Sequence, residues 1–301
     1  MSVHKIGFGA ALAAVALTLT ACGGDPTEAG ASDSDTIVVG SADFSEAEIV
    51  AEIYAQALEA KDVNVERQLR IGAREAYIPA LEGGEIDLLP EYTGNLLLYF
   101  DPEATATEAG AVEDALEEAL PEDLEILEPA SAEDKDSYNV TRELSESEGI
   151  TSIGDLAKLG TVRVGANPEF ETRPYGVPGL KSVYGVEDVE FTAISDAGGP
   201  ATIKALQDGD VDVANIYSTT PSIVANDLVT LEDPENLIAA QNLVPLINEA
   251  KASDVVEETL DAVSAELTTE DLLELNDRVD GDEKASAATA AKEWLEEKGL
   301  I

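Results

Sequence analysis

The sequence predicts an α/β protein made of two similar lobes with a ligand cleft between them. Short β-type runs alternate with amphipathic helical patterns from residue 36 to residue 301, which is typical of α/β proteins. The first part of this pattern recurs 125 positions later, since Gly165 repeats the place of Gly40. These two observations together predict two α/β lobes and not one extended sheet.

Hydrophobic periodicity and boundary residues predict each element in order. Ser45 and Glu48 have the spacing of a capping box, so a helix is expected to begin there. In the C-terminal helix Trp294 lies on the apolar side, which predicts core packing, and Gly299 suits a C-cap. The predicted strands are 36–39, 63–69, 86–89 and 161–164, and the predicted helices are 45–60, 74–81, 91–100, 107–120, 253–267, 268–279 and 284–298.

The internal repeat is clearest where residues 80–92 align with residues 205–217 without a gap. Alanine, leucine, glycine, aspartate and tyrosine coincide at the same offset. In open α/β sheets, ligands bind at the carboxyl ends of the strands. Tyr92 and Tyr217 both follow predicted strands, so we expect one tyrosine from each lobe to face the other across the cleft.

The repeat also sets the expected domain boundaries. Residues 36–139 together with 241–301 are predicted to form lobe 1, and residues 140–240 to form lobe 2. Two crossover segments would join the lobes. Lobe 2 would then be continuous in the chain, whereas lobe 1 would include the C-terminal helices.

The first 35 residues predict an address outside the cytoplasm. Residues 1–21 read as a signal peptide, with Lys5 before an apolar stretch too short for a comfortable membrane span. Residues 19–22, LTAC, resemble the lipobox of bacterial lipoproteins, in which the cysteine carries the lipid. Cys22 would therefore anchor the protein to the outer face of the cell membrane, and residues 22–35 would form a flexible tether. An ordinary secretory signal with a chance cysteine is the alternative.

Composition excludes several classes of function. The chain has 63 acidic and 17 basic residues and a net charge of −46, which disfavours binding to nucleic acid or anionic lipid and suggests adaptation to salt. His4 and Cys22 are its only histidine and cysteine. Once the leader is removed and Cys22 is lipidated, neither Ser-His nor Cys-His catalysis nor a zinc site of these residues is available. Only carboxylate, lysine or tyrosine chemistry would then remain. We expect no catalytic residues, no cofactor and no metal.

Residues 71–94, IGAREAYIPALEGGEIDLLPEYTG, resemble the signature of glycine betaine/choline/carnitine (osmoprotectant) substrate-binding proteins. Further matching blocks follow in order at residues 170–173, 179–185, 216–219, 272–276 and 294–300. The resemblance implies a type II periplasmic-binding-protein fold that closes around a solute. It also implies a monomer that delivers a quaternary-ammonium solute to the permease and ATPase subunits of an ABC importer.

The resemblance implies an aromatic cage for the solute. A quaternary ammonium has no N–H donor and can be held by the π faces of aromatic rings, each contact contributing roughly 0.5–2 kcal/mol. By this resemblance Tyr92, Tyr138 and Tyr217 are cage walls. Ordinary packing or a surface position is expected of the remaining tyrosines, which are Tyr54, Tyr77, Tyr99, Tyr175 and Tyr184.

Polar residues complete the expected ligand-binding set. Arg173 suits a ligand carboxylate, because a guanidinium binds carboxylates with two parallel hydrogen bonds. An ion pair at the surface is the alternative for this arginine. The other polar residues of the expected set are Asp43, Thr93, Asn95, Ser218 and Gln241.

The chain departs from the family pattern at three positions. Ala42 stands where members commonly have a lysine, Asn95 where a threonine is frequent and Gln241 where many have a further tyrosine. The cage is therefore less aromatic and less basic than the pattern, and Asp43 adds an acid that suits a primary amine. The exact ligand stays open for this reason.

Three other functions are left as alternatives. The same receptor role for a different amine or an amino-acid-like solute is the first. A surface lipoprotein that binds a partner without a small ligand is the second. A secreted enzyme with paired carboxylates, such as a glycosidase, is the third, although no acid pair stands out from the 63 acids.

Overall fold

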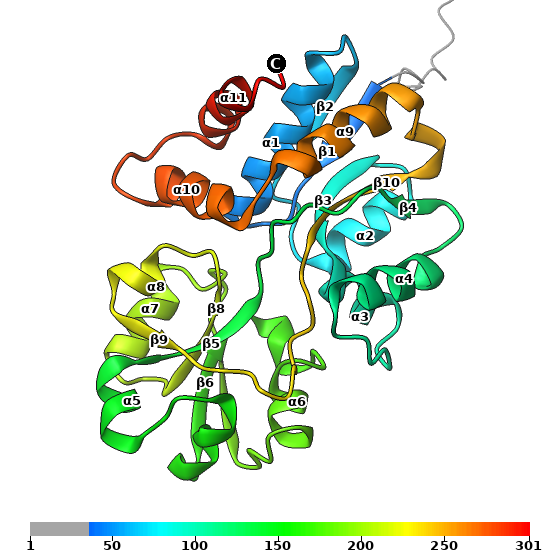
Figure 1. Cartoon of the computed structure of the whole chain (residues 1–301). Helices are drawn as coiled ribbons and strands as arrows, with labels where there is room; N and C mark the ends of the chain where they lie inside the picture. The colour runs from blue at the N-terminus through cyan, green and yellow to red at the C-terminus, as the bar shows by residue number, and fades with distance from the viewer. Residues whose placement is uncertain (1–35) are drawn as a thin grey trace, which may run out of the picture. The chain divides into compact units, whose positions relative to one another are not determined.

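Residues 36–301, which the computed structural model describes, form two five-stranded sheets with helices packed against them (Figure 1). The predicted signal peptide, the predicted tether and Cys22 lie outside these residues. No helix within the described range is both long and apolar enough to cross a membrane.

The first sheet has the strand order β2-β1-β3-β10-β4. Strands β2, β1 and β3 are parallel to one another, whereas β10 runs antiparallel to both β3 and β4. A strand from the last third of the chain therefore completes the sheet of the first third. The strands are β1 (Thr36–Gly40), β2 (Asn64–Gln68), β3 (Leu88–Tyr92), β4 (Leu124–Ile126) and β10 (Leu243–Asn248).

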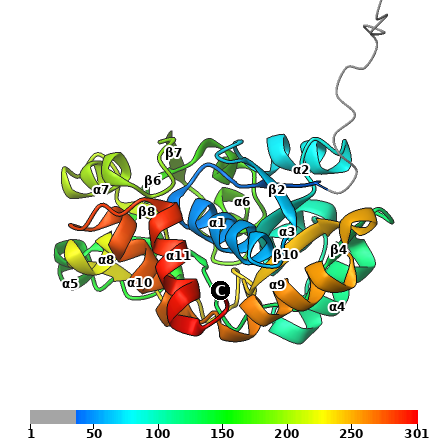
Figure 2. The same ribbon diagram turned by 90° about the horizontal axis from the view of Figure 1, so that it is seen from above.

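Two groups of helices bury the apolar side chains of this sheet in two clusters. Helix α1 packs against α9, α10 and α11, and α3 packs against α4; Figure 2 shows α1 beside α11 and α9 from above. Trp294 of α11 lies in the first cluster and is 5% exposed, which confirms its predicted packing role. The helices are α1 (Ser45–Glu59), α2 (Arg74–Glu82), α3 (Thr93–Phe100), α4 (Ala109–Ala119), α9 (Asp254–Glu266), α10 (Thr269–Asp280) and α11 (Ala287–Lys298), with the 3-10 helix η3 (Glu249–Lys251) before α9.

The second sheet repeats this design with the order β7-β6-β8-β5-β9. Strands β7, β6 and β8 are parallel, and β5 runs antiparallel to β8 and β9. Its strands are β5 (Asp136–Thr141), β6 (Val162–Ala166), β7 (Val189–Ala193), β8 (Val213–Tyr217) and β9 (Leu228–Thr230). Its helices are α5 (Arg142–Glu148), η1 (Ile153–Leu159), η2 (Pro168–Glu171), α6 (Val177–Ser182), α7 (Pro200–Gln207) and α8 (Ser222–Ala225).

Two segments of chain connect the sheets. The first leaves β4 after Ile126 and enters β5 at Asp136, and the second leaves β9 after Thr230 and enters β10 at Leu243. The proposed lobe boundaries, 139/140 and 240/241, fall close to these two segments and stay a prediction.

The predicted repeat is present in the backbone. Val38 exchanges hydrogen bonds with Asp87, and Arg163 exchanges the same bonds with Asp212; the backbone N–H of each strand residue lies 2.9 Å from the aspartate carboxylate. All four positions obey the 125-residue offset. The turns before these aspartates also agree, since Gly84 and Gly209 have φ angles of +69° and +72°, which favour glycine. The same local sequence therefore builds the same turn twice.

Two local predictions in the first third are wrong. Ser45 is not a capping residue: Phe44 occupies the N-cap, and the Ser45 hydroxyl donates to Asp280 of α10 at 3.0 Å. The helix predicted from residue 91 begins at Thr93, because residues 88–92 pair with β10. In both cases a partner far away in sequence determines the local structure.

Candidate functional site

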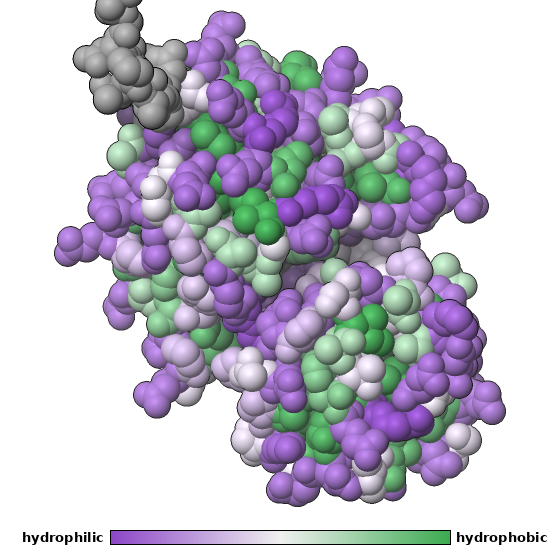
Figure 3. Space-filling model, turned by 180° about the vertical axis from the view of Figure 1, so that it is seen from behind, coloured by the Kyte–Doolittle hydropathy of each residue, from purple (hydrophilic) through white to green (hydrophobic). Residues whose placement is uncertain are grey.

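A cavity of about 280 Å³ lies where the carboxyl ends of the parallel strands of both sheets meet. The space-filling view shows the surface of residues 36–301 hollowed between two masses (Figure 3). Residues from both sheets and from the first connecting segment line the cavity. The aromatic, charged and amide side chains among them include Asp43, Phe44, Arg74, Tyr77, Tyr92, Asn95, Asp134, Asp136, Phe170, Arg173, Tyr175, Asn215 and Tyr217.

Three aromatic rings form one wall of the cavity. Tyr92 ends β3 and Tyr217 ends β8, as the repeat predicts. Phe44 touches both, with ring centroids 6.2 Å from Tyr92 and 5.2 Å from Tyr217. The sequence reasoning missed Phe44, although it directly precedes the first predicted helix. Its equivalent in the second repeat is Glu169, so the repeat carried no signal for it.

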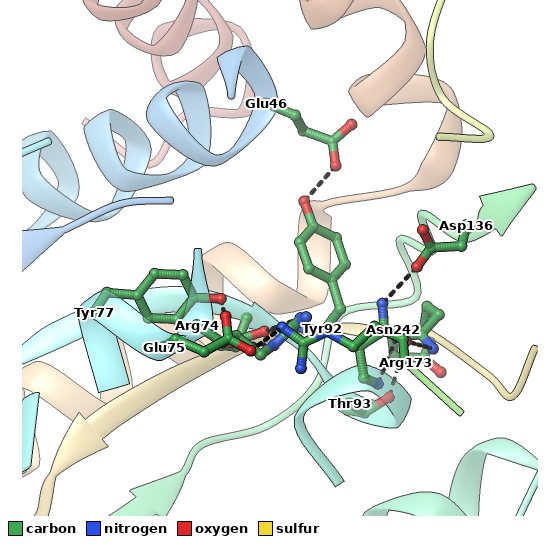
Figure 4. Close-up of polar contacts among 12 residues, drawn as sticks. Glu46, Arg74, Glu75, Tyr77, Tyr92, Thr93, Asp136, Arg173 and Asn242 are labelled. Carbon is green, nitrogen blue, oxygen red and sulfur yellow. Dashed lines mark hydrogen bonds and ion pairs between the residues drawn. The ribbon is translucent and has the colours of Figure 1, made fainter. Parts of the chain in front are cut away.

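A buried carboxyl group fixes the Tyr92 ring from behind. The Tyr92 hydroxyl donates to Glu46 of α1 at 2.5 Å (Figure 4). The Thr219 hydroxyl and the Asn276 side-chain amide also donate to Glu46, both at 2.6 Å. Burial raises the pKa of Glu46 above its usual range. Because Thr219 follows β8, this one carboxyl group connects the first sheet with the second.

Asp136, the first residue of β5, places a second buried carboxyl group at the cavity. It accepts hydrogen bonds from the side-chain amides of Asn95 at 2.7 Å and Asn215 at 3.0 Å. Asn95 belongs to α3 and Asn215 to β8, so one amide comes from each side. Burial raises the pKa of Asp136. Its direct hydrogen bonds among the described residues come from two amides, while Arg74 and Arg173 act on it through their charge and lower its pKa.

Asp134 lies two residues earlier and also lines the cavity. Its carboxylate accepts hydrogen bonds from the Ser218 hydroxyl at 3.1 Å and the Thr219 backbone N–H at 3.0 Å. Burial and then the nearby Glu46 raise the pKa of Asp134. The wall beside Tyr217 is therefore acidic.

Two arginines also line the cavity, and each has an acidic partner. Arg74 makes two hydrogen bonds to Glu91, at 2.8 and 2.7 Å; Glu91 is buried and the Arg74 side chain is 11% exposed. Arg173 follows η2 and donates from Nη2 to Glu75 of α2 at 2.6 Å. Its Nε is buried and has no hydrogen-bond partner among the described residues. Arg173 thus has one N–H donor available for a ligand.

Four residues expected to bind the ligand lie behind the lining. Tyr138 is fully buried in the core of the second sheet. There its hydroxyl donates to the Tyr175 carbonyl at 2.8 Å and its ring packs on Phe170. It therefore supports two lining residues and is not itself a wall. The hydroxyls of Thr93 and Ser218 are likewise engaged, with Asn242 and with Asp134 and Lys135, respectively.

The fourth, Gln241, is fully buried and pairs with Asn95 in both directions. Its amide donates to Asn95 Oδ1 at 2.9 Å, and its carbonyl oxygen accepts from the Asn95 backbone N–H at 2.9 Å. Asn95 in turn reaches Asp136. Gln241 thus orients the amide that holds the buried carboxylate, and it does so from the second connecting segment.

Three further residues of the cavity are Asp43, Tyr77 and Tyr175. Asp43 lines the cavity, but its side chain is largely exposed and lies 3.6 Å from Arg70, which places it at the rim. Tyr77 and Tyr175 were expected to serve packing or the surface; both are buried in core clusters, as the packing alternative predicts, and both also line the cavity. The Tyr77 hydroxyl donates to Glu91 at 2.6 Å and so completes the buried Arg74 pair.

Comparison with known proteins gives a consistent match over nearly the whole described range. Residues 35–297 match the family model described as the substrate binding domain of ABC-type glycine betaine transport system. The glycine betaine-binding protein YehZ of Escherichia coli (strain K12) is 29% identical over 278 residues, covering 87% of this chain and 90% of that protein.

Solved structures agree with this match. The apo structure of YehZ has a TM-score of 0.62 at 27% identity and covers 88% of this chain and 99% of its own. A crystal structure of a glycine betaine/carnitine/choline ABC transporter has a TM-score of 0.69 with the same coverage, and at 20% identity it bears on the fold alone.

Proposed function

The chain belongs to the family of substrate-binding domains of ABC-type glycine betaine transport systems, and on this premise we propose that its cavity captures a quaternary-ammonium solute. The family consists of receptors and not of enzymes. In each five-stranded sheet four strands run in one direction and one, β10 or β5, runs antiparallel to them, and the two sheets together have the type II periplasmic-binding-protein fold. The cavity volume, about 280 Å³, is just below the roughly 300–1,000 Å³ of typical ligand sites and therefore suits a small solute.

One observation carries the proposal: aromatic rings from both repeats share one cavity with an amide-held carboxylate. Phe44, Tyr92 and Tyr217 line the cavity together with the Asp136 carboxyl group. Both groups stabilise a bound cation that has no N–H donors, because aromatic π faces and a carboxylate attract positive charge without a hydrogen bond. The head of the solute is therefore proposed to lie against these rings.

The tail of a betaine is proposed to meet Arg173 on the other part of the lining. The free Nε–H of this arginine is a donor in a buried place, and an unpaired buried donor costs free energy until it finds an acceptor. A carboxylate at this position would satisfy it. Choline, which has no carboxylate, would leave it unsatisfied.

Titration calorimetry with glycine betaine, choline, carnitine, proline betaine and amino acids tests the proposal. Tyr217→Ala should weaken quaternary-ammonium binding by about 1–2 kcal/mol, on the scale of a desolvated cation–π contact with its packing. Arg173→Ala should weaken glycine betaine by roughly 2–5 kcal/mol, since a buried carboxylate loses its partner, and choline much less. Tyr99→Ala, in α3 outside the lining, is the control that should leave all affinities unchanged.

A different ligand class would show itself in the same experiment. If amino acids or primary amines bind and no quaternary amine does at millimolar concentration, the cage assignment is wrong and the receptor role remains. Asp136 would then be a better partner for an ammonium group than Asp43, because Asp43 is already paired with Arg70 at the rim.

We further propose that the protein works outside the cytoplasm on a lipid anchor at Cys22 and passes its solute to the permease of an ABC importer. The LTAC motif supports the anchor, and the family match supports the importer. Cys22→Ser should release the protein from the membrane fraction and abolish acylation. A variant that still carries acyl chains would contradict this assignment.

A further inference from the structure

We propose that Glu75 determines which solutes the cavity prefers, by competing with a ligand carboxylate for Arg173. The inference rests on the proposed function, since it concerns the same cavity. Glu75 lies in the first turn of α2, on the side of the first sheet, whereas Arg173 follows η2 on the side of the second. Their contact, 2.6 Å from Nη2 to Oε1, therefore joins the two sides, with Arg173 in the cavity lining and Glu75 partly exposed to solvent (Figure 4).

The guanidinium of Arg173 is only partly used by this contact. Nη2 donates to Glu75, while the adjacent Nε is buried and has no partner among residues 36–301. Nε and Nη2 together form one edge of the planar guanidinium, the fork that binds a carboxylate with two parallel bonds. Glu75 occupies half of the fork that a solute carboxylate would use.

The other arginine of the lining shows what a fixed pair looks like. Arg74 and Glu91 make two hydrogen bonds, Tyr77 adds a third, and Glu91 is 1% exposed. In contrast, the side chain of Glu75 is 56% exposed and holds Arg173 at one atom. Water can solvate Glu75 when it leaves, so this pair is the exchangeable one.

Exchange has opposite consequences for two kinds of solute. A betaine brings a carboxylate to Arg173 and must displace Glu75 or lie beside a like charge, and both oppose binding. Choline brings only a positive charge. Glu75 then offsets the positive charge of Arg173 and connects the two sides of the cavity around the solute. Glu75 should therefore disfavour betaines and favour choline.

The test measures Kd for glycine betaine and for choline in the full chain and in Glu75→Gln, which keeps the size and removes the charge. We expect Glu75→Gln to tighten glycine betaine on the order of threefold and to weaken choline by a similar factor, the range of a partly exposed ion pair. Glu82→Gln, an exposed acid at the opposite end of α2, is the matched control for general loss of negative charge and should change neither Kd.

A second background shows whether Glu75 acts through Arg173. In Arg173→Gln, adding Glu75→Gln should leave the glycine betaine Kd unchanged within error. A shift of both solutes in the same direction, or a betaine effect that persists without Arg173, would overturn the inference and leave the proposed function intact. Wild-type protein that binds neither solute would overturn both. Unfolding midpoints equal to wild type confirm that the variants are folded.

Discussion

The two repeats, residues 37–92 and 162–217, share the same arrangement of strands and turns but differ in the residues that they bring to the cavity. Strand order, turns and the strand-end tyrosines agree at a constant offset. After the first strand, however, the first repeat builds the 15-residue helix α1, whereas the second builds the short η2 and α6. The scaffold positions the tyrosines, and the divergent segment decides what surrounds them.

This divergent segment supplies opposite chemistry on the two sides of the cavity. In the first repeat it contributes Phe44 and the buried Glu46, which bonds to Tyr92. In the second it contributes Phe170, Arg173 and Tyr175. Both segments therefore supply aromatic rings, but the first adds a buried carboxyl group and the second adds the Arg173 guanidinium. A dipolar solute with separate charges fits this asymmetry, and a symmetrical pair of half-sites would not produce it.

The largest expected effect tests whether the two scaffolds are energetically equivalent. Leu81 and Leu206 occupy equivalent positions in α2 and α7 and are 0% and 2% exposed. Leu81→Ala and Leu206→Ala should each lower the free energy of unfolding by about 2–5 kcal/mol, the cost of a cavity in a packed core. Urea denaturation measures both. If only one of the two substitutions lowers the free energy of unfolding by this amount, the repeats share their backbone conformation but not their side-chain packing.

A smaller effect should separate the two strand-end tyrosines. The Tyr92 hydroxyl donates to Glu46, whereas the Tyr217 hydroxyl makes no hydrogen bond within residues 36–301. Tyr92→Phe should therefore cost about 0.5–1.5 kcal/mol of unfolding free energy, and Tyr217→Phe should stay within about 0.5 kcal/mol of wild type. Thermal and urea unfolding of both variants give the comparison. Equal costs would mean that the Glu46 bond contributes nothing to stability.

The smallest expected effect is a change in how the free energy of unfolding depends on pH. Burial raises the pKa of Glu46, so the folded protein binds this proton at pH values where the unfolded chain has released it. Stability from this group is then greatest at low pH and is lost as pH rises from about its ordinary value, 4.5, through the raised pKa. Glu46→Gln cannot titrate. The unfolding free energy of wild type minus that of Glu46→Gln should therefore fall as pH rises.

Many acids titrate in the same range in a chain with 63 of them, so the difference between the two proteins is the quantity to follow. Glu48→Gln, whose carboxylate is partly exposed on the same helix and paired with Arg70, is a suitable control. A difference for Glu46→Gln that is constant or rises with pH would contradict the burial argument.

Local sequence was sufficient for most of the secondary structure and for part of the site. Strands, turns and the constant offset follow from hydrophobic periodicity and from glycine positions, both of which act over a few residues. Tyr92, Tyr217, Arg173, Asn95 and Asp43 all line the cavity, as strand-end positions and family motifs indicated. Which solute they bind stays a prediction.

Other parts of the site lacked any local signal. Tyr138 and Tyr77 are both buried tyrosines in regular elements, yet only Tyr77 reaches the cavity. Which tyrosine lines the wall depends on packing against partners such as Phe170 for Tyr138 and Glu91 for Tyr77. The sequence did not distinguish Asp136 from the other acids, because the amides of Asn95 and Asn215 reach it only in the folded protein.

By itself, then, the sequence determined the class of fold, the repeated scaffold and the family, because these rest on periodicity and on motifs within short stretches. Only the tertiary structure decided the electrostatics of the cavity. The bonds of Asp136 to Asn95 and Asn215 and of Arg173 to Glu75 join residues 41, 79 and 98 positions apart. Such contacts exist only after both sheets have formed, and no local pattern records them.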